Sequence, residues 1–467
     1  MPMKQPNFVF ILMDDMGWKD LVCYGSEFYE TPNLDRFAAE SMRFTDAYAA
    51  CPVCSPTRAS VLSGKYPANV GVTNFIGGHT RGKLIDAPYI DHLPLEETNL
   101  AEALNEAGYA TWHVGKWHLG NSPYYPESQG FDANVGGCHW GMPMNGYFSP
   151  WDIPGLENEA PGTYLPDYLT DRAIELIESN EESQPFFLNL WYYSVHIPIQ
   201  AKEALIEKYQ KKAHRMGLDE VDPFEVGDFF PCEHKADKRI VRRLIQSDPV
   251  YAAMVESVDT NIGRLLDALE DAGYAEDTVI IFTSDNGGLA TAEGSPTCNA
   301  PLAEGKGWMY EGGTREPLLI KWPGVVEPGS ICSVPVTSPD FYPTMLEMAG
   351  LDLRPLQHTD GVSLVPLLEG GEALGREAIF WHYPHYGNQG GTPGSSVRAG
   401  DYKLIEFFED GHVELYNLRE DIGEAHDLSE EKPEVTARLR AMLSTWRARV
   451  EAIIPQPNPD YVPPSGE

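Results

Sequence analysis

The sequence predicts an α/β protein with a large central, mostly parallel sheet flanked by helices, plus a small C-terminal α+β domain with an antiparallel sheet. Two observations predict the main sheet. Apolar runs of strand length alternate with helical patterns, and four of these runs are followed at once by ionisable or oxygen-donor side chains. The smaller domain is predicted by short apolar runs near the C-terminus, which turn residues separate and one helical segment follows.

Composition limits the partners that the chain can have. Its 467 residues, 42% of them hydrophobic, are enough for two domains with large cores. It has 70 acidic and 34 basic residues, and the formal net charge of −36 argues against nucleic acid, which needs a basic surface. Seven irregularly spaced cysteines do not form a disulfide framework. No stretch is long and apolar enough for a membrane span.

The first apolar run, Asn7–Met13, has the length of a parallel strand that is covered on both faces. It ends in Asp14 and Asp15 and not in a small-residue cleavage site, so it is interpreted as a strand and not as a signal peptide. The compartment stays open: periplasmic or secreted if a signal has been trimmed, otherwise cytoplasmic, and soluble in each case. Adjacent carboxylates repel unless a cation lies between them, and hard divalent cations prefer such ligands. A solvated Asp pair is the alternative.

The stretch from Cys51 to Gly64 contains the motif Cys54-x-Pro56-x-Arg58. Pro56 suits the first turn of a helix, which would place Cys54 at the N-terminus, where backbone N–H groups can face an anion. Arg58 follows by about one helical turn, so both side chains can face one tetrahedral oxyanion. A redox or zinc-binding Cys-x-x-Cys pair and an inert buried cysteine remain alternatives.

The next helix and strand lead to a second group of polar residues. Leu100 to Ala107 have helical spacing, with Gly108 as C-cap, and Tyr109–Val114 reads as a strand. Lys116 and His118 follow at alternating positions and so point to one side, although a lone His is more often structural. Residues 121–165 are predicted to form long loops.

The remaining elements of the main domain continue this alternation. Residues 201–247 are interpreted as a solvated insertion, with the shaping of a substrate entrance as the alternative. The strand at 185–193 precedes His196, and the strand at 278–283 precedes Asp285 and Asn286. The others are helices over 167–180 and from 249 to 273, a long loop containing Lys306, and a strand over 317–322. Because ligands of open α/β sheets bind beyond the carboxyl ends of the strands, these polar residues are predicted to gather along one edge.

A domain boundary is predicted near residues 368–371, which divides the chain into 1–370 and 371–467. Strands are expected over 379–383, 397–408 and 413–416, with a hairpin turn between the last two, and a helix over 433–453. The tail 455–467 is Pro-rich and expected to be extended.

With these residues in place, the sequence resembles the formylglycine-dependent (type I) sulfatases of the alkaline phosphatase superfamily. The resemblance covers most of the chain and rests on motifs in the family's order. These are Asp14-Asp15, Cys54-Ser-Pro-Thr-Arg58 with Ala-Ser-x-Leu-Ser-Gly, Gly-Lys116-Trp-His118, His196-x-Pro, Ser-Asp285-Asn286-Gly-Gly and Gly-Gly-Thr-Arg315. The resemblance implies an alkaline-phosphatase-like fold and hydrolysis of sulfate esters.

The resemblance also implies a site. Cys54 would be converted to formylglycine by a formylglycine-generating enzyme, and its hydrate would attack sulfur. Residue 54 and the oxygen donors Asp14, Asp15, Asp285 and Asn286 would hold one divalent cation, Ca²⁺ in the first place and Mg²⁺ in the second. The expected catalytic roles are alcohol protonation by His196, sulfate contact by Lys306, support of the formylglycine oxygens by Arg58 and Lys116, and deprotonation of the second hydroxyl by His118.

The substrate is expected to be a sulfated carbohydrate, of the galactose or N-acetylgalactosamine type with a 4-O-sulfate, or else another sulfate ester. The segment from Trp381 to Asn388 offers aromatic and His/Asn side chains that suit sugars, and His382, His385 and Arg398 are the candidate substrate contacts. Ordinary packing is the alternative for this segment. A phosphate or phosphonate ester hydrolase of the same superfamily and a non-catalytic sulfated-glycan-binding protein are the rival functions.

Overall fold

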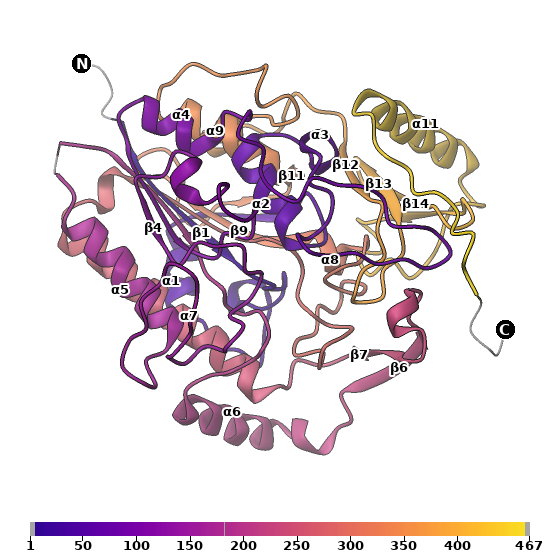
Figure 1. Ribbon diagram of the computed structural model, residues 1–467, viewed down its shortest axis with the longest axis horizontal. Helices are drawn as coiled ribbons and strands as arrows, with labels where there is room; N and C mark the ends of the chain where they lie inside the picture. The colour runs from indigo at the N-terminus through magenta and orange to yellow at the C-terminus, as the bar shows by residue number, and fades with distance from the viewer. Residues whose placement is uncertain (1–4, 182, 463–467) are drawn as a thin grey trace.

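The computed structural model describes residues 5–462 except residue 182. Within these residues, nine strands form a central sheet in the order β10-β2-β9-β8-β1-β5-β3-β4, with β11 paired to β2 (Figure 1). Strands β8, β1, β5, β3 and β4 are mutually parallel, and β9 runs antiparallel to both β8 and β2. The predicted large, mostly parallel sheet is therefore confirmed.

The strands of the central sheet have the following bounds: β1 Asn7–Met13, β2 Met42–Tyr48, β3 Ala110–Gly115, β4 Ala133–Val135, β5 Phe186–Trp191, β8 Thr278–Ser284, β9 Arg315–Lys321, β10 Ile331–Cys332 and β11 Val336–Thr337. The helices around it are α1 Pro32–Ala39, α2 Cys54–Ser63, α3 Pro67–Val70, α4 Leu100–Glu106, α5 Leu165–Glu178, α6 Glu203–Met216, α7 Pro249–Asp271, α8 Glu311–Thr314, α9 Phe341–Met348 and α10 Val365–Leu368.

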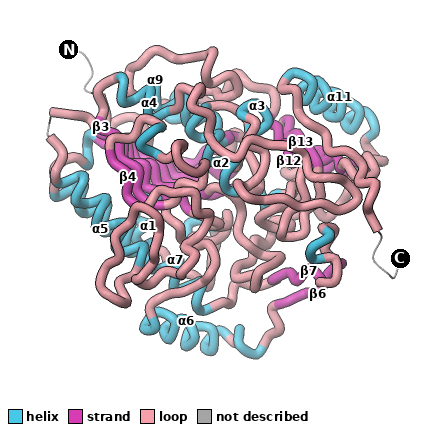
Figure 2. Tube along the Cα trace, viewed as in Figure 1, coloured by secondary structure: helices cyan, strands magenta, loops and turns pink. Residues whose placement is uncertain are grey.

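Strand β1 shows why the sheet is covered on both faces. Its side chains alternate between two hydrophobic cores, so that Val9 and Ile11 pack with α1, α5 and α7, whereas Phe8 and Phe10 pack with α2, α4 and α9. Figure 2 shows these helices as separate layers on either side of the strands. The uninterrupted apolar sequence of β1 is thus the signature of a strand in the middle of three layers.

A second sheet near the C-terminus is antiparallel, in the order β12-β13-β14-β15. Its strands are β12 Ile379–Tyr383, β13 Gly394–Ala399, β14 Tyr402–Phe407 and β15 Val413–Asn417, and helix α11 Pro433–Arg449 packs on it. The stacked rings of Phe380 and Trp446, 4.9 Å between centroids, are part of this contact. The sheet and helix confirm the predicted α+β arrangement, while the domain boundary stays a prediction.

The structure differs from the expected elements at several places. The single strand expected over 397–408 is two strands, β13 and β14, because Gly400 turns the chain at a φ of 62°. Strands β2, β4, β10 and β11 and helices α1, α3, α8, α9 and α10 were not expected. Residues 201–247 contain α6 and a hairpin of β6 Phe224–Phe229 and β7 Arg239–Arg243. The last helix ends at Arg449. Residues 463–467 of the predicted extended tail lie outside the described residues.

The described residues include no helix that combines the length and the apolar character needed to cross a bilayer.

Candidate active site

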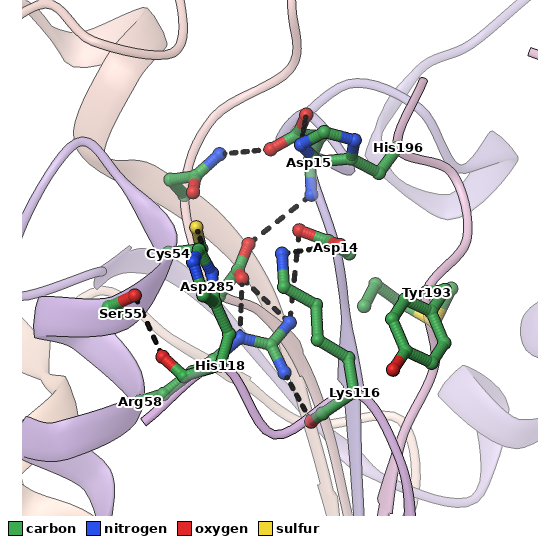
Figure 3. Close-up of polar contacts among 12 residues, drawn as sticks. Asp14, Asp15, Cys54, Ser55, Arg58, Lys116, His118, Tyr193, His196 and Asp285 are labelled. Carbon is green, nitrogen blue, oxygen red and sulfur yellow. Dashed lines mark hydrogen bonds and ion pairs between the residues drawn. The ribbon is translucent and has the colours of Figure 1, made fainter. Parts of the chain in front are cut away.

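Four neighbouring parallel strands, β8, β1, β5 and β3, deliver the predicted polar residues to one edge of the sheet (Figure 3). The Asp pair follows β1, Lys116 and His118 follow β3, His196 follows β5, and Asp285 with Asn286 follows β8. The N-terminus of α2 brings Cys54 and Arg58 to the same place. The structure therefore brings these side chains together at one edge, as the sequence predicted.

Cys54 is the first residue of α2 and is almost fully buried. Its Sγ lies 3.3 Å from Nδ1 of His118, and the other ring nitrogen, Nε2, lies 3.1 Å from the carbonyl oxygen of Ile76. Because that carbonyl can only accept, Nε2 carries the proton and Nδ1 presents its lone pair to position 54. Burial and the neighbouring Lys116 hold the pKa of His118 well below its usual range, so the ring is a neutral base.

The cysteine itself is not activated as a thiolate. Burial raises the pKa of Cys54 above its usual value, and the lowering influence of Lys116 and Lys306 does not overcome it. Cys51 is also free and buried, and its pKa is raised by burial as well. A reactive redox cysteine needs a low thiol pKa. The raised pKa values of Cys54 and Cys51 therefore argue against the redox alternative.

Arg58 ties α2 to the end of β8. Its Nε donates to Asp285 at 2.9 Å and its NH1 group donates to the carbonyl oxygen of Lys116 at 3.0 Å, while its NH2 group forms an ion pair with the same Asp285 oxygen at 2.7 Å. Its guanidinium carbon also lies 5.1 Å from the ring centroid of Trp191. This fully buried fork fixes the relative positions of Asp285, residue 116 and the start of α2.

Two lysines hold the two adjacent carboxylates. Nζ of Lys116 lies 2.7 Å from Asp14, and Nζ of Lys306 lies 2.8 Å from Asp15. Burial raises the pKa of Asp14 well above its usual range, and the nearby carboxylates of Asp285 and Asp15 add to this. At Asp15 burial acts in the same direction, but the charges of Lys306, above all, and of Lys116 outweigh it and lower the pKa. Both aspartates are buried, so they are not a solvated pair.

His196 is paired with Lys306. The distance from Nζ of Lys306 to Nε2 of His196 is 2.9 Å, and Nδ1 lies 2.8 Å from the carbonyl oxygen of Ile197. Lysine has no acceptor, so Nε2 accepts and the ring proton sits on Nδ1. Burial and the charge of Lys306 lower the pKa of His196 to about 3. In this arrangement the proton between the two residues belongs to the lysine.

The donor set fits a hard divalent cation. Oδ1 of Asp14 and Oδ1 of Asn286 are buried without a hydrogen-bond partner, and unpartnered buried oxygens are uncommon in native proteins. Donor atoms of Asp14, Asp15 and His196 also lie within 4.8 Å of one another. Oxygen-rich sets of this kind suit Ca²⁺ or Mg²⁺. His196 was not among the expected ligands, and Asp285, which was, has one oxygen committed to Arg58.

The backbone is strained at two of these positions. Asp15 has a φ of 63° and His118 a φ of 55°, values that residues with side chains rarely adopt. Such conformations persist where the surrounding structure enforces them, and they cluster at functional sites. The strained backbone therefore indicates that the segments after β1 and β3 hold Asp15 and His118 in positions required for function.

The three expected substrate contacts are already engaged by protein groups. His382 has both ring nitrogens on protein atoms, 2.7 Å from Oγ of Ser395 and 3.0 Å from the Ile453 carbonyl oxygen. His385 pairs with Asp86 at 2.8 Å and with Oγ1 of Thr73 at 2.9 Å. Arg398 pairs with Asp46 at 2.7 Å and also binds Tyr48. All three are buried, and this geometry favours structural roles for them.

Two parts of the site were missed by sequence reasoning. Ser55 donates from Oγ to the His118 carbonyl oxygen at 2.9 Å and accepts from the Ile76 N–H at 3.1 Å. The Ile76 carbonyl sets the His118 tautomer. Ile76 acts through its backbone, so its side-chain identity carries no signal, whereas Ser55 could have been noticed as a hydroxyl beside Cys54.

Comparison with known proteins places these observations in context. A family model described as Sulfatase matches residues 6–351, and a second, N-sulphoglucosamine sulphohydrolase, C-terminal, matches residues 304–449. A protein of Formosa agariphila named Sulfatase is 32% identical, with 95% of this chain and 89% of the relative covered. The human N-acetylgalactosamine-6-sulfatase is 29% identical, with 97% and 87% covered.

Solved structures give the same result. The crystal structure of Ps i-CgsB matches with a TM-score of 0.77 at 27% identity, covering 99% of this chain and 95% of that one. The same protein matches equally well in complex with k-i-k-neocarrahexaose.

Proposed function

The chain belongs to the sulfatase family and is a sulfuric ester hydrolase, and from this premise we propose that it releases inorganic sulfate from a galactose-type sugar of a sulfated glycan. We further propose that the nucleophile is a formylglycine made from Cys54 by a formylglycine-generating enzyme. The observation that carries this proposal is the neutral His118, whose Nδ1 lone pair faces position 54 at the buried N-terminus of α2.

We propose that the site holds one divalent cation, preferably Ca²⁺, with Mg²⁺ as the alternative. Its ligands would be residue 54 and the buried oxygens of Asp14, Asp15, Asp285 and Asn286. Such a cation would supply charge stabilisation to the sulfate oxygens. The unpartnered oxygens of Asp14 and Asn286 support this assignment. Carboxylate and amide donors are also the ligands that hard cations prefer.

The side chains of this chain have separate tasks in the proposed reaction. His118, as a neutral base, accepts a proton from a hydroxyl at position 54 through Nδ1. Arg58 and Lys116 hold the oxygens of the modified residue, and Lys306 donates a hydrogen bond to the sulfate. His196 has no proton on Nε2, so protonation of the leaving alcohol requires transfer across the 2.9 Å contact from Lys306. The pair, and not His196 alone, is therefore the proposed acid.

The sugar and the position of its sulfate belong to the proposal as well. We assign the sulfate to O4 of a galactose or N-acetylgalactosamine unit, and O6 is the competing assignment. The name of the human relative, N-acetylgalactosamine-6-sulfatase, favours the same sugar type and the second position. A relative that is solved with a neocarrahexaose supports an oligosaccharide as substrate class.

Sulfate release tests the proposal. Protein co-expressed with a formylglycine-generating enzyme is given matched galactose and N-acetylgalactosamine sulfates, esterified at O4 or O6, with Cys54→Ala as the blank. Mass spectrometry of the peptide around position 54 reports the modification. Release from one regioisomer and none from the blank is expected. If formylglycine is present and no sugar sulfate is cleaved, the galactose-type assignment fails, and phosphate and phosphonate esters are tested next. Binding of sulfated glycans without turnover would indicate the non-catalytic alternative.

A further inference from the structure

A cavity of about 530 Å³ opens beside the catalytic residues. Part of its wall is the segment from Phe75 to Arg81, which is anchored to the site because Ile76 binds both His118 and Ser55. Its other side includes Asn388, from a loop in which Gly387 and Gly391 approach the backbone of Gly307, next to Lys306. The cavity therefore lies between two loops that contact the reaction centre.

A second cavity, of about 510 Å³, shares two lining residues with the first, Arg81 and Glu233. Nε of Arg81 lies 2.7 Å from Glu233, and the backbone N–H of Glu233 donates to the Arg81 carbonyl oxygen at 2.8 Å. Asn458 donates to the same Glu233 carboxylate at 2.9 Å. The ion pair lies between the two cavities, and the Arg81 side chain is 59% exposed. A ligand that occupies both cavities can therefore contact it.

The walls of the second cavity combine aromatic and polar groups. Phe229 on β6 is 50% exposed, with the guanidinium of Arg239 lying 4.7 Å from its ring centroid, and Tyr461 lines the cavity from the C-terminal segment. Glu409 pairs with Lys83 at 3.2 Å and accepts from the Tyr386 hydroxyl at 2.7 Å. Aromatic faces beside fixed hydrogen-bonding groups are the surface that a sugar ring requires.

The charge of the second cavity selects among sugars. The cavity is lined by two cationic side chains, Arg81 and Lys83, but by four carboxylates, Asp228, Glu233, Glu409 and Asp460. A sulfated or uronic sugar would meet net repulsion there, since like charges at short range are unfavourable. An uncharged sugar would meet donors, acceptors and aromatic rings without that cost. The hairpin interpreted from sequence as a solvated insertion thus supplies a wall of this cavity.

We propose that the two cavities form one groove for an oligosaccharide, in which the second cavity binds an uncharged sugar beyond the sulfated one. This rests on the proposed function and deepens it. The preferred substrate is then a chain in which sulfated galactose-type units alternate with uncharged units. Chains whose alternate unit is a uronic acid are disfavoured.

Calorimetric binding tests this without turnover. The full chain carrying Cys54→Ala is titrated with a sulfated galactose monosaccharide, with a κ-carrageenan tetrasaccharide, whose alternate sugar is uncharged, and with a chondroitin sulfate tetrasaccharide, whose alternate sugar is a uronate. The κ-carrageenan tetrasaccharide is expected to bind at least tenfold more tightly than either of the others. Equal affinity for the monosaccharide and both tetrasaccharides, or no binding of any, overturns the proposal.

Matched variants in the same background locate the effect. Phe229→Ala should weaken tetrasaccharide binding about tenfold and leave monosaccharide binding unchanged. Phe224→Ala is the control, because Phe224 lies on the same strand, is 38% exposed and has Arg243 4.6 Å from its ring centroid, but does not line the cavity. Tyr461→Ala gives an independent reading if the hairpin variant fails to fold. The groove is contradicted if Phe229→Ala and Tyr461→Ala bind the tetrasaccharide with the same affinity as the Phe224→Ala control.

Failure of the groove and failure of the proposed function are distinguishable. Sulfate release from a small aryl sulfate by formylglycine-containing protein depends on the catalytic residues and not on the second cavity. Aryl sulfate turnover combined with length-independent binding rejects the groove alone. Tight, Phe229-dependent binding of the tetrasaccharide without any turnover supports the groove and rejects the catalytic proposal.

Discussion

Replacing Arg58 by lysine is the sharpest test of how the site is held together. Arginine donates two hydrogen bonds here, one to Asp285 and one to the carbonyl oxygen of Lys116, and its third nitrogen forms an ion pair with Asp285. Lysine keeps the charge, but its single ammonium group cannot reproduce the planar fork. The variant therefore removes geometry and leaves the local charge unchanged.

The magnitude follows from the bonds that are lost. If the lysine keeps the ion pair with Asp285, one hydrogen bond between charged groups is lost, worth about 1.5–3 kcal/mol, and one to a carbonyl, worth about 0.5–1.5 kcal/mol. The sum is about 2–4.5 kcal/mol. Since about 1.4 kcal/mol corresponds to a factor of ten in rate, full expression in the transition state would lower kcat/KM by about 30- to 1600-fold.

The assay compares Arg58→Lys with Arg376→Lys. Arg376 likewise joins a carboxylate to a backbone carbonyl, with hydrogen bonds to Asp340 at 2.6 and 2.8 Å and to the Pro335 carbonyl oxygen at 3.0 Å. Both variants should lose similar free energy of unfolding in urea. Only Arg58→Lys should lose about 100-fold in kcat/KM for an aryl sulfate. The reasoning is refuted if Arg58→Lys keeps kcat/KM within threefold of wild type while losing the same stability as the control.

Three further predictions concern stability. Lys403→Met should lower the free energy of unfolding in urea by about 3–5 kcal/mol. The buried ammonium group of Lys403 lies 2.9 Å from Glu311 and 3.0 Å from Glu424, so both buried carboxylates lose this counter-charge. A cost below about 1 kcal/mol would show that the two carboxylates find other partners. Burial lowers the pKa of His382 to about 3, so its unfolded form, titrating near 6.5, binds the extra proton and stability falls as pH drops from about 6.5 toward 3, by on the order of 1.4 kcal/mol per pH unit. His382→Gln should flatten that part of the curve, and an unchanged slope contradicts the assignment. Adding Ca²⁺ at about 100 times its Kd should stabilise the protein by about 2.7 kcal/mol in thermal unfolding, EDTA should reverse this, and Asn286→Ala should weaken it; no shift at millimolar Ca²⁺ argues against the cation site.

The sequence carried enough information to place most of the site. Apolar runs that end in polar residues identified four strands, and parallel strands share one carboxyl edge, so Asp14, Lys116, His196 and Asp285 could be grouped before any coordinates. Strand β2 escaped this reasoning because Arg43, Thr45 and Asp46 interrupt its apolar pattern. The split between β13 and β14 was missed although the sequence carries a signal for it: Gly400 and Asp401 form the two-residue connection of a hairpin, with Gly400 at a φ of 62°.

The interpretation of His382 and His385 shows a different limit. The local sequence does not distinguish a histidine that binds a sugar from a histidine whose two ring nitrogens are both bound by protein atoms. The partners of His382 come from Ser395 and from the carbonyl of Ile453, and only the fold brings these together. Polar residues that satisfy each other's hydrogen-bonding groups across the fold can therefore be recognised only when the tertiary contacts are known.

The charges of the site explain how a strongly acidic protein can bind an anionic ester. At the edge of the sheet the neighbouring histidines and Cys54 are neutral, whereas three carboxylates and three cations are buried and cancel in charge: Asp14, Asp15, Asp285, Arg58, Lys116 and Lys306. A neutral set inside a chain of net charge −36 offers a sulfate ester no net attraction. One divalent cation among the carboxylates changes the set to a net charge of +2 in surroundings of low dielectric constant, where such a charge acts strongly. It would also counter the repulsion that contributes to the raised pKa of Asp14. The proposed cation would thus be required for substrate binding as well as for chemistry.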